Sequence, residues 1–165
     1  MLPKQPKAMD FQSANPAHVA ILEALHQACF PPKEAWSAAF FKGQLALPGT
    51  QGWVGLVPGP AREGEPIGLC LVRSQPGFGS EPGECEILTL GIVPAWRSRG
   101  HGGKLLAHAL KEPMRRRERI LLEVEADNLP AKTLYHHMGF REVALRPGYY
   151  GQGRDALLMA CQPGT

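Results

Sequence analysis

The chain has 165 residues, of which 44% are hydrophobic and 20% are charged, and its formal net charge is +3. These proportions are typical of a globular domain with a core, and they exclude an intrinsically disordered chain. The net charge is too small to indicate a nucleic-acid partner by itself. No apolar run has membrane length, and residues 1–7 lack the apolar centre of a secretory signal, so we expect no membrane partner.

The four cysteines form no C-x-x-C pair and have no metal-ligand spacing; they are Cys29, Cys70, Cys85 and Cys161. Disulfides are rare in reducing compartments, where isolated cysteines are most often buried thiols. The sequence therefore predicts a cytoplasmic protein with reduced cysteines and no metal site.

Residues 1–8 contain two prolines and two lysines and predict a flexible leader, which leaves 9–165 as a single domain. From Pro16 the apolar residues recur at helical spacing, and this helix is expected to end at the prolines 31–32. A second helix is predicted over 34–46, with a buried face that consists of Phe40, Phe41 and Leu45. Strands are predicted at 53–57 and 67–72, where turn residues flank short apolar runs.

The central stretch combines a strand, a glycine-rich turn and a helix. Residues 87–93 form an apolar run of strand length that Pro94 ends, because proline donates no ladder hydrogen bond. Further on, apolar residues cover one face of a helix; these are Leu105, Leu106, Ala109 and Leu110. The turn between them contains Arg97, Ser98, Arg99, Gly100, His101, Gly102 and Gly103.

This turn has the composition of a phosphate site. The first turn of a helix leaves backbone N–H groups unpaired, and the helix dipole adds partial positive charge there. Glycines let an anion approach these amides, and two arginines add full charges. The pattern lacks the G-K-[ST] ending of a P-loop and the third glycine of a dinucleotide fingerprint. An ordinary turn with solvated arginines is the alternative interpretation.

The second half continues the alternation of strands and helices. A strand is predicted over 120–126. A short helix follows, capped by Asn128 and ended by Gly139. Two closing strands are predicted over 140–145 and 156–160. The arginines at 115–119 fit a solvated helix end, and RNA contact is the minority interpretation. The pattern as a whole predicts an α/β or α+β domain with a mixed sheet.

The turn, with its R-x-x-G-x-G spacing, resembles the pyrophosphate loop of the GNAT acyltransferases. The second half resembles the bacterial ribosomal-protein-alanine N-acetyltransferases (the RimI type). Its matching motifs occur in the family's order: Leu122-Glu123-Val124, Asn128, Leu134-Tyr135, Gly139-Phe140 and Tyr149-Tyr150. The chain departs from the family at Arg97, where glutamine is usual, at His101, where an apolar residue is usual, and at Gly103, where a basic residue is usual. Pro113 falls within a helix that normally continues.

The resemblance implies the GNAT fold, a central mixed and mostly antiparallel sheet flanked by helices. It also implies acetyl-CoA as the cofactor, bound by the backbone of Leu90, Gly91 and Ile92, by the turn 97–103, by Asn128 and by Tyr135. By the same resemblance, Glu123 is the general base, acting through water, and Tyr135 is the general acid toward the coenzyme A sulfur. Tyr149 and Tyr150 are expected to line the acceptor pocket.

Each assignment has an alternative. Glu84 and Glu86 are rival bases; Glu123 would otherwise be an exposed strand residue paired with an arginine. Tyr135 would otherwise be a core aromatic, and the tyrosine pair would pack over the sheet.

The expected reaction is acetylation of a protein N-terminal α-amino group, such as alanine on a ribosomal protein. An α-amine, with a pKa of about 8, demands less of a base than lysine, with a pKa of about 10.4. The alternatives are a small-molecule amine acetyltransferase, a non-catalytic acyl-CoA sensor and, more weakly, an RNA-associated accessory protein.

Overall fold

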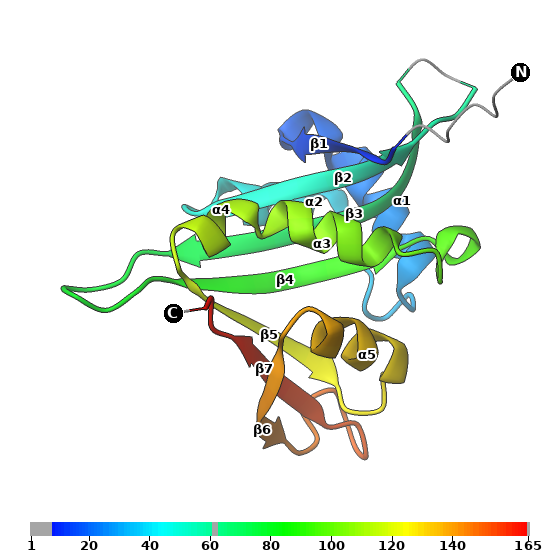
Figure 1. Ribbon diagram of the computed structural model, residues 1–165. Helices are drawn as coiled ribbons and strands as arrows, with labels where there is room; N and C mark the ends of the chain where they lie inside the picture. The colour runs from blue at the N-terminus through cyan, green and yellow to red at the C-terminus, as the bar shows by residue number, and fades with distance from the viewer. Residues whose placement is uncertain (1–7, 61–62, 165) are drawn as a thin grey trace, which may run out of the picture. The chain divides into compact units, whose positions relative to one another are not determined.

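The computed structural model describes residues 8–60 and 63–164, so the predicted leader, apart from Ala8, lies outside the described residues. Figure 1 shows the helices and strands. In chain order they are β1 (Asp10–Ala14), the 3-10 turn Pro16–His18, α1 (Val19–Cys29), α2 (Ala38–Ala46), β2 (Thr50–Val57), β3 (Glu65–Gln75), β4 (Glu84–Ile92), the 3-10 turn Pro94–Trp96, α3 (His101–Ala109), α4 (Lys111–Arg115), β5 (Arg119–Glu125), α5 (Leu129–His137), β6 (Arg141–Arg146) and β7 (Ala156–Cys161).

Within the described residues, seven strands form one sheet in the order β1-β2-β3-β4-β5-β7-β6. β1 pairs antiparallel with β2, and β7 pairs antiparallel with both β5 and β6. β4 and β5 are parallel, with residue pairs from Glu84–Arg119 to Glu86–Leu121. This mixed sheet with flanking helices confirms the predicted α/β fold.

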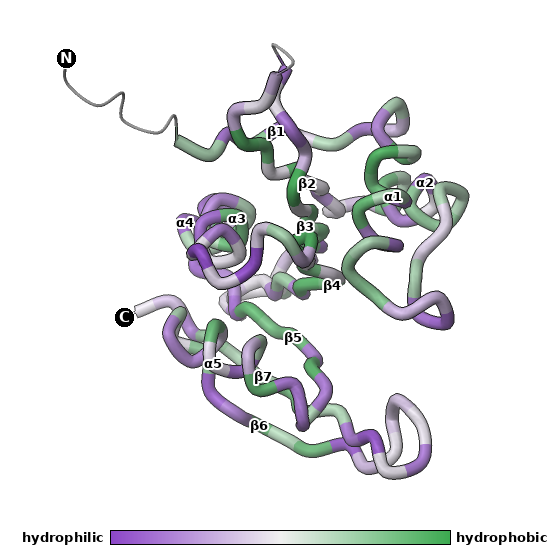
Figure 2. Tube along the Cα trace, turned by 90° about the vertical axis from the view of Figure 1, so that its right-hand side faces the viewer, coloured by the Kyte–Doolittle hydropathy of each residue, from purple (hydrophilic) through white to green (hydrophobic). Residues whose placement is uncertain are grey.

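The chain divides into two compact units. Unit 1 consists of residues up to Leu71 together with Thr89–Ala109, and it contains α1, α2 and α3. The ribbon and the tube views agree that α3 covers one face of β2 and β3, while α1 and α2 cover the opposite face (Figures 1 and 2). Figure 2 shows hydrophobic residues concentrated along β2 and β3, between these two helical layers. The fully buried side chains of this core include Leu22, Phe41, Leu69, Leu105 and Leu106.

Unit 2 consists of Val72–Leu88 and Leu110 onward. Its strands β5, β7 and β6 lie side by side, and α5 packs on one face of them (Figure 1). Burial alternates along β5, because successive side chains point to opposite faces of a strand. One β5 face therefore enters a core whose members include Ile120, Leu122, Phe140 and Met159. The other face carries Glu123 and Glu125.

The helix predicted over 34–46 is wrong in its first turn, since α2 begins at Ala38. Ser37 ends the preceding loop as the N-cap, and its hydroxyl accepts the N–H of Phe40 at 3.1 Å. Phe41 is fully buried as predicted, whereas Phe40 is 45% exposed. The hydrophobic face of α2 is thus narrower than the sequence indicates.

Two further features differ from the sequence prediction. The edge strand β1 was not predicted, because DFQSA lacks a clear apolar alternation. Pro113 does not interrupt a helix where it stands: the interruption lies at Leu110, the N-cap residue of the short α4. Proline is compatible with the first turn of α4, where N–H groups have no intrahelical acceptor.

Candidate active site

The predicted phosphate turn connects β4 to α3 within unit 1. Ser98 has φ 61° and Gly100 has φ 82°, so the chain turns sharply through two left-handed residues. The Lys104 N–H donates to the Gly100 carbonyl at 3.2 Å, the first hydrogen bond of α3. The amides just before Lys104 therefore have no acceptor within the helix, and neither Gly102 nor Gly103 has a side chain to cover them.

Arg97 supports this turn from within. Its Nε donates to the Ile92 carbonyl at 2.8 Å and its Nη2 to the Cys29 carbonyl at 3.3 Å. Cys29 is the last residue of α1, where a cation also suits the helix dipole. The guanidinium is thus engaged with backbone carbonyls, and its contact with a phosphate stays a prediction.

The other charged residue of the turn faces solvent. The Arg99 guanidinium lies 4.8 Å from the centre of the Trp96 ring, which also makes an edge contact with the His101 ring. Burial and the neighbouring cations Lys104 and Arg99 lower the pKa of His101 below its usual value. Its Nδ1 is buried without a hydrogen-bond partner among the residues the structure describes.

The end of β4 carries the three residues expected to align the pantetheine arm, Leu90–Ile92. They lie beyond Glu86–Leu121, the last residue pair of the described β4–β5 ladder. Gly91 leaves little room for a side chain, because a Cβ there would lie 3.0 Å from both Cβ and Sγ of Cys29 and 3.3 Å from the Phe30 ring. The close approach fixes the end of α1 against this part of β4.

Glu123, the predicted base, has two partners in unit 2. An oxygen of its carboxylate lies 2.9 Å from Nη1 of Arg146, and its side chain is 21% exposed. The Tyr149 hydroxyl is hydrogen-bonded to the same carboxylate, and the negative charge of Glu123 raises the pKa of Tyr149. The arginine pairing that was the alternative interpretation of Glu123 is therefore present. A carboxylate has further lone pairs, so this pairing leaves acceptor capacity for a water.

The rival bases lie on β4 and are both exposed. Glu84 lies 3.9 Å from Nη1 of Arg119, which is the limit of an ion pair. Glu86 is paired with Leu121 in the β4–β5 ladder, its side chain is exposed, and its charge makes the smallest contribution to raising the pKa of Tyr149. The exposed carboxylate of Glu86 therefore stays a rival candidate for the base.

The other predicted residues of unit 2 lie on or beside α5. Asn128 is its N-cap, as predicted, and accepts the Ala131 N–H at 3.2 Å. Tyr135 is buried, 8% exposed, with its ring against the edge of Phe140. The side-chain oxygen of Asn128 thus stabilises the helix, and a role of either residue in cofactor binding stays a prediction.

Tyr149 and Tyr150 pack edge to face at 5.1 Å in the segment that joins β6 to β7. Sequence reasoning missed the arginines at both ends of this segment. Arg146 pairs with Glu123, and Arg154 pairs with Glu125 through Nε at 2.6 Å. Only the alternation of Glu123 and Glu125 in the sequence could have indicated these pairs, because two carboxylates on one strand face favour cationic partners.

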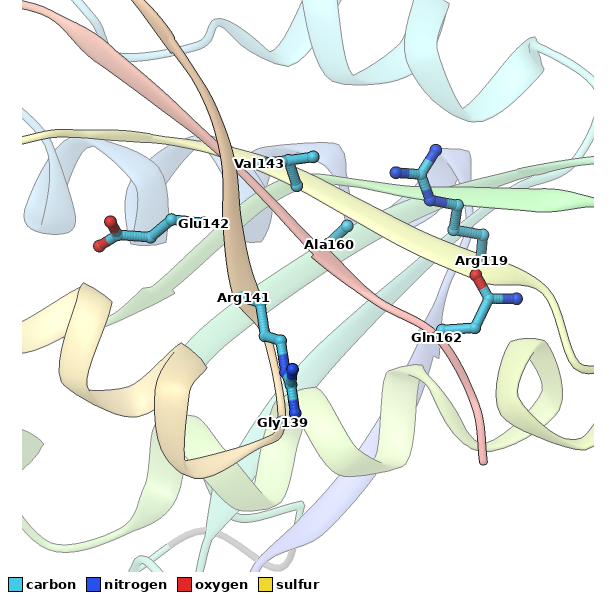
Figure 3. A pocket seen from close by; sticks show the side chains of 7 residues that line it. All are labelled: Arg119, Gly139, Arg141, Glu142, Val143, Ala160 and Gln162. Carbon is cyan, nitrogen blue, oxygen red and sulfur yellow. The ribbon is translucent and has the colours of Figure 1, made fainter. Parts of the chain in front are cut away.

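Figure 3 shows a depression of about 490 Å³ in unit 2 that contains none of the predicted site residues. Its walls consist of Arg119, Gly139, Arg141, Glu142, Val143, Ala160 and Gln162. The Arg119 and Arg141 side chains point in different directions, and Glu142 turns toward α5, where it meets Lys132. The charges do not converge, so this depression is not a candidate anion site.

The arginines at 115–119 are mostly paired. Arg115 lies 2.7 Å from Glu112, Arg116 2.7 Å from Glu118, and Arg119 near Glu84. Acidic partners within the chain therefore account for three of the four guanidiniums, which weakens the RNA interpretation.

All four cysteines are free thiols, as predicted, although Cys29 is only half-buried. No helix in the described residues is both long and apolar enough to cross a bilayer.

A mixed sheet whose fourth strand leads into a glycine-rich turn and a helix N-terminus defines an α/β protein, and phosphate binding at that turn stays a prediction. The model of the acetyltransferase (GNAT) family matches residues 19–140. The chain belongs to this family, which confirms the resemblance seen in its motifs.

Individual proteins are also similar in sequence to this chain. The chain is 35% identical over 131 residues to the N-alpha-acetyltransferase RimI of Mycobacterium tuberculosis, covering 79% of this chain and 77% of that protein. It is 36% identical over 106 residues to an N-alpha-acetyltransferase of Sulfolobus acidocaldarius, covering 59% of this chain. It spans only 63% of that second relative and 38% of a related, uncharacterized Mycobacterium leprae protein.

Solved structures show the same fold. Arabidopsis thaliana NAA60 in complex with a bisubstrate analogue superimposes with a TM-score of 0.80 at 26% identity, covering 94% of this chain and 98% of that chain. The ribosomal-protein-S18-alanine N-acetyltransferase of Escherichia coli superimposes with a TM-score of 0.76 at 20% identity, covering 96% of each chain.

Proposed function

We propose that this protein transfers the acetyl group of acetyl-CoA to the α-amino group of a protein N-terminus. The observation that carries the proposal is the 35% identity, over most of both chains, to a relative named as an N-alpha-acetyltransferase. NAA60, at 26% identity, has also been solved with acetyl-CoA. We further propose alanine on a ribosomal protein as the acceptor, because a 37% identical Escherichia coli relative, matched over 81 residues, is named for that reaction.

The turn before α3 suits the diphosphate of the acetyl donor. Free amides at a helix N-terminus and glycines without Cβ atoms make a cradle for an anion. Arg99 adds an exposed positive charge, held in place by the Trp96 ring. The backbone of Leu90, Gly91 and Ile92 would hydrogen-bond the pantetheine arm.

The chemistry needs a base and an acid. The amine nitrogen attacks the thioester carbonyl, the carbon–sulfur bond breaks, one proton leaves the amine, and one proton reaches the thiolate. Glu123 would accept the amine proton through a bridging water. Its carboxylate is held in place by Arg146 and Tyr149, yet it can still accept a hydrogen bond from that water. Tyr135 would protonate the sulfur. Glu86, which is exposed and whose charge contributes to raising the pKa of Tyr149, is the rival base.

The test is acetylation of a synthetic peptide that begins with alanine, followed by mass spectrometry and by release of the coenzyme A thiol. We expect one acetyl group on the peptide and none on the same peptide with a blocked N-terminus and an internal lysine. Acetylation of polyamines without acetylation of the peptide would favour a small-molecule enzyme. A thermal shift with acetyl-CoA but no turnover on any amine would favour a sensor.

The base is tested by Glu123→Gln with Glu86→Gln as the matched control. Loss of a general base lowers the rate by roughly a hundredfold or more. We expect that loss for Glu123→Gln and a much smaller one for Glu86→Gln. The reverse order would assign the base to Glu86 and leave the proposed reaction intact.

A further inference from the structure

The segment 147–155, which joins β6 to β7 and is called the tyrosine hairpin below, is rich in glycine, and the Gly148 N–H donates to Asp155 Oδ1 at 2.8 Å across it. It contains three glycines with positive φ, namely Gly148, Gly151 and Gly153. Glycine loses more conformational freedom on folding than any other residue, so a segment rich in it needs external contacts to hold one shape. Its few internal backbone bonds include Gly151 N–H to Gly148 O at 3.1 Å and Arg154 N–H to Gly151 O at 3.0 Å.

Arg154 supplies one of these external contacts, besides the Ala126 N–H, which donates to the Asp155 carbonyl at 2.9 Å. Its Nε donates to one carboxylate oxygen of Glu125 at 2.6 Å, and its Nη2 donates to the other at 3.1 Å. This two-bond geometry is the most directional ion pair that proteins form, and only arginine provides it. Glu125 is the last residue of β5 and is paired in the ladder with Ala156, so the anchor stands on the sheet itself.

The same guanidinium reaches the tyrosines. Nη1 of Arg154 donates to the Tyr150 carbonyl at 3.4 Å, and the guanidinium lies 5.9 Å from the centre of the Tyr150 ring. The Tyr150 N–H in turn donates to the Arg154 carbonyl at 3.0 Å. One side chain therefore connects the end of β5 with the backbone and the ring of Tyr150.

The two carboxylates on this face of β5 thus have different partners. Glu123 pairs with Arg146, before the hairpin, and Glu125 pairs with Arg154, near its end. Tyr149 is hydrogen-bonded to Glu123 and packs against Tyr150, so a displacement of Tyr150 also disturbs the residue that contacts the proposed base.

We propose that Arg154 and Glu125 are positioning residues that hold the tyrosine hairpin in the conformation that receives the acceptor peptide, and that they thereby set the KM for the acceptor. The inference rests on the proposed function and on the sequence-based expectation that Tyr149 and Tyr150 line the acceptor pocket. Ordering a binding segment before the ligand arrives lowers the entropic cost of binding, which is the physical basis of the expected effect on KM.

The test measures initial rates with full-length protein, acetyl-CoA and the alanine peptide. We expect Arg154→Ala to raise the KM for the peptide by about tenfold and to leave the KM for acetyl-CoA unchanged. Arg154→Lys, which retains the charge and one hydrogen bond, should give an intermediate value. Glu125→Gln should raise the same KM, and the double variant Arg154→Ala/Glu125→Gln should be no worse than Arg154→Ala, because both changes remove one interaction.

The matched control is Glu142→Gln, which removes the contacts of another carboxylate of unit 2 with α5, to Lys132 at 3.4 Å and to His136 at 3.5 Å, away from the hairpin. It should leave both KM values unchanged. Amide hydrogen exchange gives a readout that needs no turnover: residues 148–155 should exchange faster in Arg154→Ala than in the wild type or in Glu142→Gln.

An unchanged peptide KM in Arg154→Ala, an equal rise of both KM values, or additive effects in the double variant would overturn the proposal. Failure of the wild type to acetylate any N-terminal peptide would instead refute the proposed function. In that case hydrogen exchange still shows whether Arg154 orders the hairpin.

Discussion

The imidazole Nδ1 of His26, near the end of α1, accepts the backbone N–H of Trp36 at 3.0 Å, across the loop that precedes α2. The other ring nitrogen, Nε2, lies 3.1 Å from the Thr89 hydroxyl on β4. Because Nδ1 accepts, Nε2 carries the proton and donates to Thr89. His26 is 2% exposed and stacks between the Phe30 and Trp36 rings. A neutral histidine thus fixes the loop to helix α1 and strand β4.

This arrangement predicts a pH-dependent loss of stability. Burial lowers the pKa of His26 from 6.5 to about 4, so the unfolded chain binds a proton in a range where the native state does not. The free energy of unfolding should therefore fall as the pH drops from about 6.5 to about 4, by up to about 3 kcal/mol from this residue. Urea unfolding at several pH values in this range measures it.

His26→Gln isolates the contribution, because glutamine does not titrate while paired carboxylates elsewhere still do. The difference in unfolding free energy between wild type and variant should shrink as the pH falls. A difference that stays constant over this range would mean that His26 has the same pKa in the native state as in the unfolded chain.

Local patterns predicted the parts of the fold that local chemistry determines. The strand–turn–helix plan of 87–110 follows from hydrophobic periodicity and glycines, and the Asn128 cap follows from its position before a proline-led helix. Each of these patterns involves residues only a few positions apart in the sequence, so it can be interpreted without knowledge of the tertiary fold.

The parts that sequence reasoning missed depend on distant partners. His26 and Thr89 are 63 residues apart, and Arg154 and Glu125 are 29 apart. Nothing in the sequence says which of the 18 lysines and arginines a given carboxylate will meet. The pairing of Glu123 with Arg146 was foreseen only as a generic alternative, because the fold decides which arginine lies opposite a strand position.

A side chain at Gly91 is expected to lower the stability of the protein. In Gly91→Ala the new Cβ would lie 3.0 Å from the Cβ and Sγ of Cys29, backed by Phe30 at 3.3 Å. The Cys29 and Phe30 side chains must move by a few tenths of an ångström, and we expect a loss of about 1–3 kcal/mol in the free energy of unfolding. Thermal or urea unfolding measures the loss.

Cys29→Ala removes Sγ and so relieves part of the same overlap. The double variant Gly91→Ala/Cys29→Ala should lose less stability than the two single losses combined. Strict additivity would show that Cys29 is not what limits space at Gly91. Gly43→Ala, where a Cβ meets no atom within 4 Å, is the control.

The pairing of Tyr149 with Glu123 predicts a titration. The carboxylate charge and its hydrogen bond raise the pKa of Tyr149 above the usual value for tyrosine, because both disfavour the phenolate. Glu123→Gln removes the charge, so the pKa of Tyr149 should fall. NMR of tyrosine labelled at Cζ would follow the resonance, which Tyr149→Phe identifies. A resonance that titrates identically in wild type and Glu123→Gln would contradict the pairing.

The buried Glu118 is expected to contribute to the free energy of unfolding. This buried carboxylate, 5% exposed, accepts the Ser74 hydroxyl at 2.6 Å and Nε of Arg116 at 2.7 Å. In Glu118→Ala the Ser74 hydroxyl loses its acceptor, while the Arg116 side chain, 41% exposed, can turn to water. We therefore expect a loss of about 2–3 kcal/mol, at the lower end for a broken buried pair. Urea unfolding provides the measurement.

Glu112→Gln is the matched control, since its pair with Arg115 is exposed on both sides and lies on the neighbouring helix α4. Exposed pairs contribute little, so no measurable change is expected there. Equal effects of Glu118→Ala and Glu112→Gln would mean that burial does not distinguish the two pairs. Ser74→Ala should lie between them, because it leaves Glu118 with Arg116 as its partner.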